Sequence, residues 1–169
     1  MAIINTIKQK ILELDQGTFQ NLCDQILYSL GYSNFVSLGS QSGTQKTTPG
    51  TPDTYCINED NKYVFVEYTT QQTGLRKKIT DDIQKCLNSS ETGIDSKDIS
   101  EIIYFHTSSN LKPAVHKEFC EMCEEKSIVF NMWGIDRIAN HLFSERRDLA
   151  KDYLQISYDT NQIFSIEDF

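Results

Sequence analysis

The alternation of strand-like and helix-like segments in the second half of the chain is the feature that most limits how it can fold. Apolar runs rich in β-branched and aromatic residues take turns with segments in which apolar residues recur every three or four positions. The strand-like runs lie at 63–70, 101–107 and 127–133, and the helical segments at 75–87, 113–126 and 135–143. Strands that alternate with helices are usually parallel neighbours joined by crossover helices, so we expect a parallel sheet here.

Two helical segments open the chain. The first runs from Ile3 to Leu14 and carries an isoleucine-rich stripe. The second follows the spacing of an amphipathic helix over 19–30, and we predict Thr18 as its N-cap and Gly31 as the residue just after its end. One side of this second helix must therefore face a core.

The strands between these helices and residue 75 have a different arrangement. A short strand is predicted at 34–39, and two more at 54–57 and 63–70 are joined by the turn sequence Asn-Glu-Asp-Asn at 58–61. This turn is typical of a hairpin, so the early strands form an antiparallel meander. Together with the parallel second half, the pattern predicts an α/β fold, a three-layer α/β/α sandwich with a central mixed sheet.

The bulk composition limits the domain organisation. The 169 residues are enough for one domain with a core, which we place at 1–152, and we interpret 153–169 as a tail or a connector to a possible further domain. No run approaches the ~20 apolar residues of a membrane span, and the start lacks the apolar segment of a signal peptide. We therefore expect a cytoplasmic protein that does not bind membranes, with its five cysteines reduced.

Two acidic residues stand where a strand would usually carry core residues. Glu67 interrupts the apolar run Val-Phe-Val-Glu-Tyr, and Asp53 lies just before the preceding strand, so a hairpin would bring the two carboxylates together. Such a pair repels unless a cation lies between them, and oxygen ligands suit Mg²⁺ or Mn²⁺. Thr69 and Gln71 are expected to follow Glu67 on the same face of the strand. The alternative is structural: Asp53 caps a turn and Glu67 pairs with a lysine.

The order of these segments resembles the PD-(D/E)XK nuclease superfamily, and within it the restriction-endonuclease-like domains of the Mrr type. The helix TFQNLCDQILYSLGY is similar to the opening helix of that family, Pro52-Asp53 matches the PD element, and Glu67 matches the acid of the second element. The later segments EIIYFHTSSN and SIVFNMWGIDRIANHL resemble its next strand, final strand and closing helix. The resemblance covers about residues 15–143, through short motifs in a specific order.

This resemblance implies a set of site residues. Asp53 and Glu67 would be metal ligands, with the backbone carbonyl of Tyr68 as a third oxygen. Gln20 occupies the position of the family's opening-helix acid and would contact the substrate, and Asp24 on the same helix could substitute for that acid. Gln71 would face the phosphate.

The main departure from the family is Thr69, which stands where the family has its catalytic lysine. Threonine can hold a water through its hydroxyl but supplies no positive charge. The missing cation could come from Lys46, Lys77 or Lys78, and Arg76 would be placed to contact a phosphate. The alternative for these four side chains is an ordinary solvated surface.

The resemblance therefore implies a metal-dependent endonuclease that acts on double-stranded DNA. Similar domains are N-terminal effectors of bacterial antiphage proteins, which would make this chain a defence effector and a homo-oligomer through a larger parent protein. The net charge of −8 argues against binding nucleic acid by bulk electrostatics but is compatible with a carboxylate-and-metal site. The alternatives are a catalytically inactive DNA-binding or assembly module and an RNA nuclease. His106, at the end of a strand, is a substrate contact or a structural histidine.

Overall fold

The computed structural model describes residues 2–38 and 51–156, and its elements follow the predicted order closely. The helices are α1 (Ala2–Leu12), α2 (Gln16–Ser29), α3 (Leu75–Leu87), α4 (Ser89–Thr92), α5 (Pro113–Glu124), α6 (Ile135–Ser144) and α7 (Arg147–Leu154), with a 3₁₀ turn at Ser96–Asp98. The strands are β1 (Val36–Ser37), β2 (Thr54–Ile57), β3 (Tyr63–Thr69), β4 (Ile99–His106) and β5 (Val129–Trp133).

The sheet is mixed, as predicted. Its strands lie in the order of the sequence, β1-β2-β3-β4-β5. The β1–β2 and β2–β3 pairs are antiparallel, and the β3–β4 and β4–β5 pairs are parallel. The hairpin makes β2 and β3 antiparallel, and the crossover helices α3 and α5 make the later strands parallel. Both connections are those that the sequence predicts.

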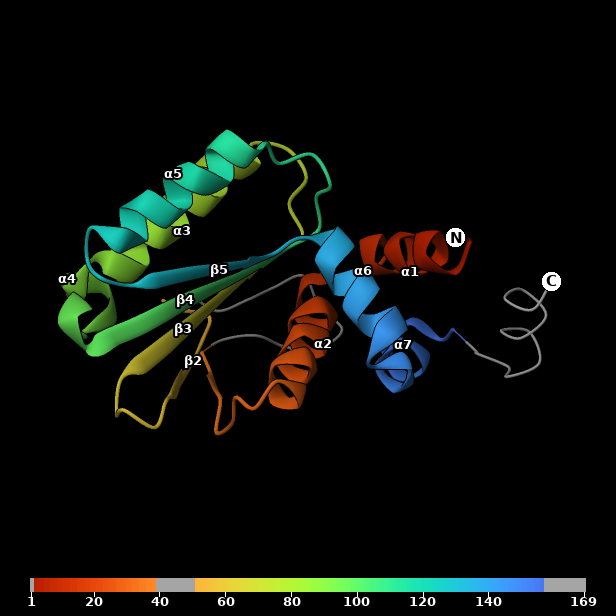
Figure 1. The fold of residues 1–169 in the computed structure, drawn as a ribbon, viewed down its shortest axis with the longest axis horizontal. Coiled ribbons are helices and arrows are strands. Elements are labelled where there is room, and N and C mark those ends of the chain that lie inside the picture. Colours follow the sequence, from red (N-terminus) through yellow and green to blue (C-terminus); the bar gives the residue numbers. More distant parts are fainter. Residues whose placement is uncertain (1, 39–50, 157–169) are drawn as a thin grey trace.

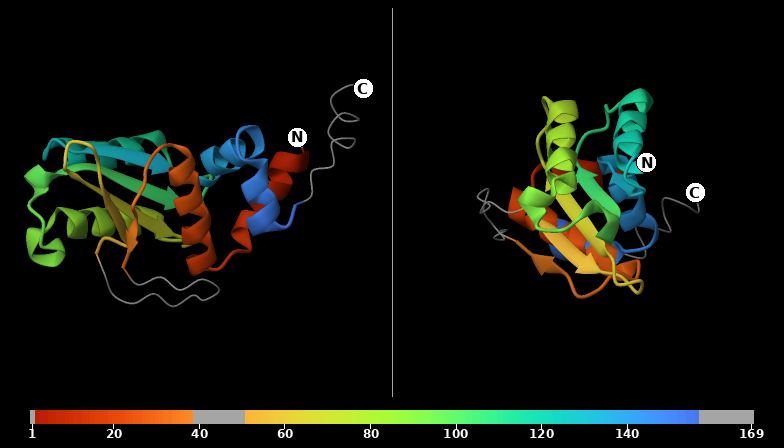
Figure 2. Two further views of the ribbon diagram at one scale, coloured as in Figure 1. Left: turned by 90° about the horizontal axis from the view of Figure 1, so that it is seen from below. Right: turned by 90° about the vertical axis from the view of Figure 1, so that its left-hand side faces the viewer.

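Helices cover both faces of the sheet and complete the three layers (Figure 1). On one face α3 and α5 lie side by side over β3 to β5, and Phe65 and Tyr104 point toward them. On the other face α2 packs against the sheet, and α1, α6 and α7 gather beside α2 near the ends of the strands (Figure 2). Val66, Tyr68 and Phe105 belong to the core that these helices share with the sheet. Because side chains alternate along a strand, the apolar residues of β3 alternate between these two cores. The predicted sandwich is therefore confirmed.

The start of α2 differs from its prediction. Its N-cap is Asp15, whose side chain accepts a hydrogen bond from the backbone N–H of Thr18 at 2.7 Å. Thr18 itself lies within the first turn, so its prediction as N-cap is wrong. Both residues are good capping types, and aspartate three residues before that N–H has the spacing of an N-cap. The end of the helix is as predicted, since Gly31 has the left-handed φ of +101° that favours glycine.

Helix α7 has no counterpart in the sequence prediction. It continues through Leu154, which is buried in the core beneath α2, so the boundary expected after residue 152 falls inside a helix. Its apolar residues are too few for a clear period, and charged residues separate them. Most of the expected tail at 157–169, and the loop at 39–50 that contains Lys46, lie outside the described residues. In the part of the chain that is described, no helix has the length and apolar character needed to cross a membrane.

Candidate functional site

The β2–β3 hairpin brings Asp53 and Glu67 together. Thr54 pairs with Val66 in the antiparallel register, and continuing that register by one residue places Asp53 opposite Glu67. The Asp53 carboxylate is fixed there by the backbone N–H of Tyr68, which donates to its Oδ2 at 3.2 Å. The two carboxyl groups also hydrogen-bond to each other. The acid within the strand and the acid before its neighbour therefore form one pair on the α3 face of the sheet.

This pair is held together in a buried, acidic environment. Glu67 is only 5% exposed, and burial raises its pKa. The neighbouring charge of Asp53 and the hydrogen bond between the two carboxyl groups raise it further. Burial also raises the pKa of Asp53, while its hydrogen bond with Glu67 acts in the opposite direction. Because this hydrogen bond raises the pKa of Glu67 and lowers that of Asp53, the proton that the pair shares favours Glu67 as the donor. Asp53 is the charged acceptor.

Helix α3 adds a carboxylate–cation pair next to these two acids. Asp82 is buried, and its Oδ2 accepts a hydrogen bond from the Tyr104 hydroxyl at 2.6 Å and lies 3.1 Å from Lys78 Nζ. Burial alone would lower the pKa of Lys78, but the charges of Asp82, Glu67 and Asp53 outweigh it and raise that pKa. Lys78 is therefore a fully charged ammonium group facing three acids.

The contacts continue along the same face of α3. One helical turn beyond Asp82, the Cys86 thiol donates to Glu67 Oε1 at 3.3 Å. Tyr104 lies beside Glu67 in the parallel register of β3 and β4. Burial and the charge of Asp82 raise the pKa of Tyr104, so its hydroxyl remains a donor. Strands β2, β3 and β4 and helix α3 thus all contribute to one polar cluster inside an otherwise apolar layer.

Asp82, Cys86 and Tyr104 are the members of this cluster that sequence reasoning missed. One available signal was the position of Asp82 between Ile79 and Ile83 on the buried stripe of α3, where an acid is as unusual as Glu67 in its strand. Tyr104 gave no such signal, because an aromatic residue in a strand-like run is ordinary core.

The two polar residues expected to follow Glu67 are placed differently from each other. Thr69 lies on the same face as Glu67 and is buried, and its Oγ1 accepts a hydrogen bond from the backbone N–H of Gln71 at 3.1 Å. Strand β3 ends at Thr69, so the prediction that Gln71 continues the strand alternation is wrong. Gln71 is exposed instead, and its Nε2 donates to the carbonyl of Thr73 at 2.6 Å just before α3 begins.

The residues expected from α2 lie on the other face of the sheet. Gln20 is 1% exposed and donates to Thr54 Oγ1 at 3.1 Å, so it fastens α2 to β2 instead of lying beside Asp53. Asp24 accepts a hydrogen bond from the Tyr68 hydroxyl. Burial raises the pKa of Asp24 to about 7, although the bond from Tyr68 acts to lower it. Both side chains serve the interior between α2 and the sheet.

The expected third oxygen ligand also has a partner. The backbone carbonyl of Tyr68 accepts a hydrogen bond from Gln16 Nε2 at 3.0 Å. The same Gln16 accepts, through its Oε1, from the backbone N–H and the hydroxyl of Thr70, each at 3.1 Å. This glutamine therefore holds the end of β3 in place. A carbonyl oxygen has a second lone pair, which keeps it available to a further partner.

The remaining basic residues lie on the exposed side of α3. Arg76 forms a two-pronged ion pair with Glu118 of α5 at 2.8 and 3.0 Å, and Lys77 pairs with Asp81 at 2.7 Å. Arg76 and Lys77 therefore have local partners on the protein surface, which agrees with the alternative that they are ordinary surface residues. Of the three candidate lysines, Lys46 lies outside the described residues and Lys78 is the one whose charge acts on Asp53 and Glu67.

His106 fits the structural alternative. It is buried at the end of β4, its Nδ1 accepts a hydrogen bond from the backbone N–H of Ser108 at 3.1 Å, and burial lowers its pKa to about 4. Its ring packs so close to Gly134 that a Cβ there would lie 2.9 Å from His106 Cε1. The histidine is therefore neutral and wedged between β4 and the start of α6.

The oxygen groups present suit a divalent metal of the Mg²⁺ type, with a limited number of protein ligands. Across residues 2–38 and 51–156, no three His, Cys, Asp or Glu side chains are grouped so that they could hold a metal ion. Mg²⁺ does not need such a group, because it is usually bound through one or two carboxylates and keeps several waters. Asp53 and Glu67 supply two carboxylates, provided that Glu67 releases its proton.

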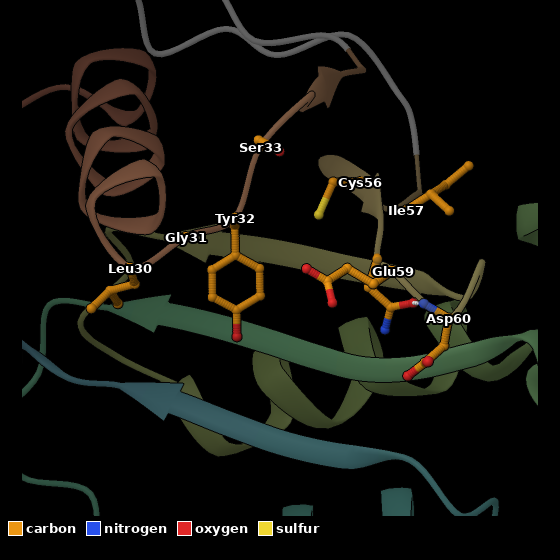
Figure 3. Close-up of a pocket in the computed structure, with 9 residues that line it drawn as sticks. Leu30, Gly31, Tyr32, Ser33, Cys56, Ile57, Glu59 and Asp60 are labelled. Carbon is orange, nitrogen blue, oxygen red and sulfur yellow. Dashed lines mark hydrogen bonds between the residues drawn. The ribbon is translucent and has the colours of Figure 1, made fainter.

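A hollow in the surface lies away from this cluster, between the end of α2 and the β2–β3 hairpin (Figure 3). Its volume is about 390 Å³, and Tyr32, Cys56, Glu59 and Asp60 are among its lining residues. Tyr32 points toward β4, where its hydroxyl donates to Glu101 Oε1 at 2.9 Å. None of the expected site residues lines this hollow, so it does not extend the acid cluster.

Comparison with known proteins leaves the family open. No model of a known protein family matches the chain, and a search of curated proteins finds no significant relative. The resemblance to the PD-(D/E)XK nucleases therefore stands on the quoted motifs alone.

Proposed function

We propose that this domain is a metal-dependent endonuclease that hydrolyses DNA phosphodiester bonds, with Mg²⁺ or Mn²⁺ bound by Asp53 and Glu67. The observation that carries the proposal is the buried carboxyl pair with raised pKa values, facing the charged Lys78. Burying two acids against each other costs folding stability, and such costs are concentrated at functional sites. The resemblance to the PD-(D/E)XK superfamily supports the same site.

Each residue of the cluster has a role in this proposal. Asp53 and Glu67 would hold the metal, with Glu67 in its deprotonated form. The bound metal would lower the pKa of a water and offset charge on the phosphate. Lys78 provides, from α3, the positive charge that Thr69 lacks, and its partial exposure lets the ammonium group reach a phosphate oxygen. Asp82 positions Lys78, and Tyr104 positions Asp82.

The wider biological role rests on the resemblance alone. It comprises double-stranded DNA as the substrate, action as an antiphage effector, a cytoplasmic location, and assembly into homo-oligomers through a larger parent protein. An RNA substrate would use the same chemistry at the same acids. These parts of the proposal are separable from the hydrolytic site and need their own tests.

The alternative is an inactive nuclease-like module that binds DNA or supports assembly. Two observations favour it. Without metal, the site is internally satisfied, because Glu67 and Asp53 share a proton and Lys78 is paired with Asp82. Thr69, in turn, is buried and bonded to the backbone of Gln71. In this alternative the cluster only joins α3 to the sheet.

Cleavage assays separate the two functions. The purified protein is incubated with supercoiled plasmid and with RNA in the presence of Mg²⁺ or Mn²⁺, beside the variants Asp53→Asn and Glu67→Gln. These substitutions keep the shape of each side chain and remove its charge. Loss of cleavage in both variants, with wild-type folding by circular dichroism, is expected. Cleavage that persists in both would show that the site lies elsewhere, and DNA binding without cleavage by the wild type would support the inactive module.

A further inference from the structure

A small cavity opens next to the acid pair on the same side of the hairpin. Its volume is about 260 Å³. Strands β2 and β3 form its floor through Tyr55, Tyr63 and Phe65. Pro52 lies on one side, and Thr92 and Ile94, which follow α3, lie on the other. Leu38, after β1, also lines the cavity, so several separate segments build it, and the β2–β3 hairpin is the part that it shares with the candidate site.

The cavity and the acid pair are adjacent because both are formed by the same face of the β2–β3 hairpin. Tyr55 lies two residues after Asp53 and Phe65 two residues before Glu67, on the same face of the same hairpin. Successive residues on one face of a strand are about 7 Å apart. Pro52, which lines the cavity, directly precedes Asp53. A substrate group in the cavity would thus lie beside the phosphate held at Asp53 and Glu67.

The residues that line the cavity indicate which chemical group could bind in it. Tyr55 and Tyr63 lie with ring centroids 5.8 Å apart, and Tyr63 and Phe65 with centroids 6.1 Å apart. Tyr55 and Tyr63 are only partly buried, so their rings remain accessible. No charged side chain among the described residues lines the cavity. A flat, uncharged aromatic group fits this lining, whereas a phosphate does not.

We infer that this cavity is a subsite for one unpaired nucleobase of the cleaved strand, stacked on Tyr55 and Tyr63. The inference rests on the proposed nuclease function and narrows its substrate. A base that is stacked and paired within a duplex cannot enter, so it must be single-stranded, in an overhang or a bulge, or turned out of the helix. The domain should therefore prefer strands with an unpaired nucleotide beside the cut over a continuous duplex.

The test separates base binding from cleavage. Oligonucleotides carrying one 2-aminopurine are prepared as a single strand, a continuous duplex and a duplex with a one-nucleotide bulge. Fluorescence quenching in the presence of Ca²⁺ measures base stacking, and cleavage with Mg²⁺ is followed on the same substrates. Tyr55→Leu and Tyr63→Leu remove the stacking surface but keep an apolar side chain against the core. Tyr28→Leu is the control, because Tyr28 is an exposed tyrosine of α2 away from the cavity.

The expected result is about 5- to 150-fold weaker binding of the single strand and the bulge by each cavity variant, with the quench lost. Tyr28→Leu should bind like the wild type. Cleavage that depends on Asp53 but is equal on all substrates and unaffected by the cavity variants would overturn the subsite and leave the nuclease proposal intact. A quench lost in Tyr55→Leu, without cleavage by any protein, would support the subsite and refute hydrolysis. An unchanged quench in both cavity variants overturns the subsite.

Discussion

Replacing Lys78 by methionine tests whether α3 supplies the cation of the site. The substitution keeps most of the aliphatic side chain and removes the ammonium group that lies 3.1 Å from Asp82 Oδ2. Lys77 offers a matched control, since it forms the same i,i+4 pair with Asp81 at 2.7 Å on the solvent side of the helix. The two variants thus differ in whether the lost charge faces the acid cluster.

The expected cost follows from the exposure of each pair. Lys77 and Asp81 are 82% and 43% exposed, and such a surface pair contributes about 0.3–0.5 kcal/mol. Removing one partner of a fully buried pair costs about 3–5 kcal/mol, because the other charge is left uncompensated. The Asp82 side chain is 9% exposed but Lys78 is 37% exposed, so water screens the pair in part. We therefore expect Lys78→Met to lower the free energy of unfolding by about 1–2 kcal/mol.

Two measurements on the same protein preparations check this reasoning. Urea denaturation gives the loss of stability, and the initial rate of plasmid cleavage gives the catalytic effect. For Lys78→Met we expect a rate about 10²–10³ lower, the range for loss of one group that stabilises transition-state charge, and for Lys77→Met a rate near that of the wild type. Equal effects of the two substitutions on stability and on rate would refute the assignment of Lys78. A stability loss confined to Lys78→Met, with an unchanged rate, would leave the pair a purely structural role.

Three further predictions concern protonation and helix capping. Asp24→Asn should raise the free energy of unfolding near about pH 8 by about 2–4 kcal/mol. Burial raises the pKa of Asp24 to about 7, so the folded state binds more protons than the unfolded state and its stability falls as pH rises from about 4 to about 7. Denaturation across that pH range measures this, and an equally steep profile in the variant would contradict it. Mg²⁺ should raise the wild-type Tm more at about pH 8 than at about pH 5, because Glu67 must release a proton. Calorimetry in two buffers that differ in ionisation enthalpy should detect that proton, and Glu67→Gln should abolish both effects; a Tm shift independent of pH would argue against metal at this pair. Asp15→Ala should cost about 1 kcal/mol in urea denaturation through loss of the α2 cap, and a negligible cost would contradict the capping contact to Thr18.

Sequence patterns predict the sheet and the acid pair because both depend on local periods. Alternation along β3 and the turn after β2 are sufficient to bring Asp53 beside Glu67. The face on which Gln20 lies is not local information, since it depends on how α2 packs across the sheet. Its partner Thr54 is the immediate neighbour of Asp53 yet points to the opposite face. One position of strand alternation thus decides whether a side chain joins the acid pair on the α3 face or faces α2 on the other side of the sheet.

The contribution of α3 to the site also depends on packing that the local sequence does not specify. The sequence places Lys78 and Asp82 one helical turn apart, but the rotation of the helix against β3 and β4 decides that this turn faces Glu67 and Tyr104. Rotation is set by the packing of Ile79 and Ile83, and a helical period alone does not specify the strand that these residues will meet.

Burial makes position 69 better suited to threonine than to lysine. Thr69 is 3% exposed and lies beside His106 in the register of β3 and β4, where burial already keeps the histidine neutral. An ammonium group at that position would have to be desolvated at the end of a packed strand, at a cost of several kcal/mol. On α3 the same charge stays partly in water and is still close enough to act on all three acids. A cation supplied from the helix therefore costs less folding stability than one supplied from the strand.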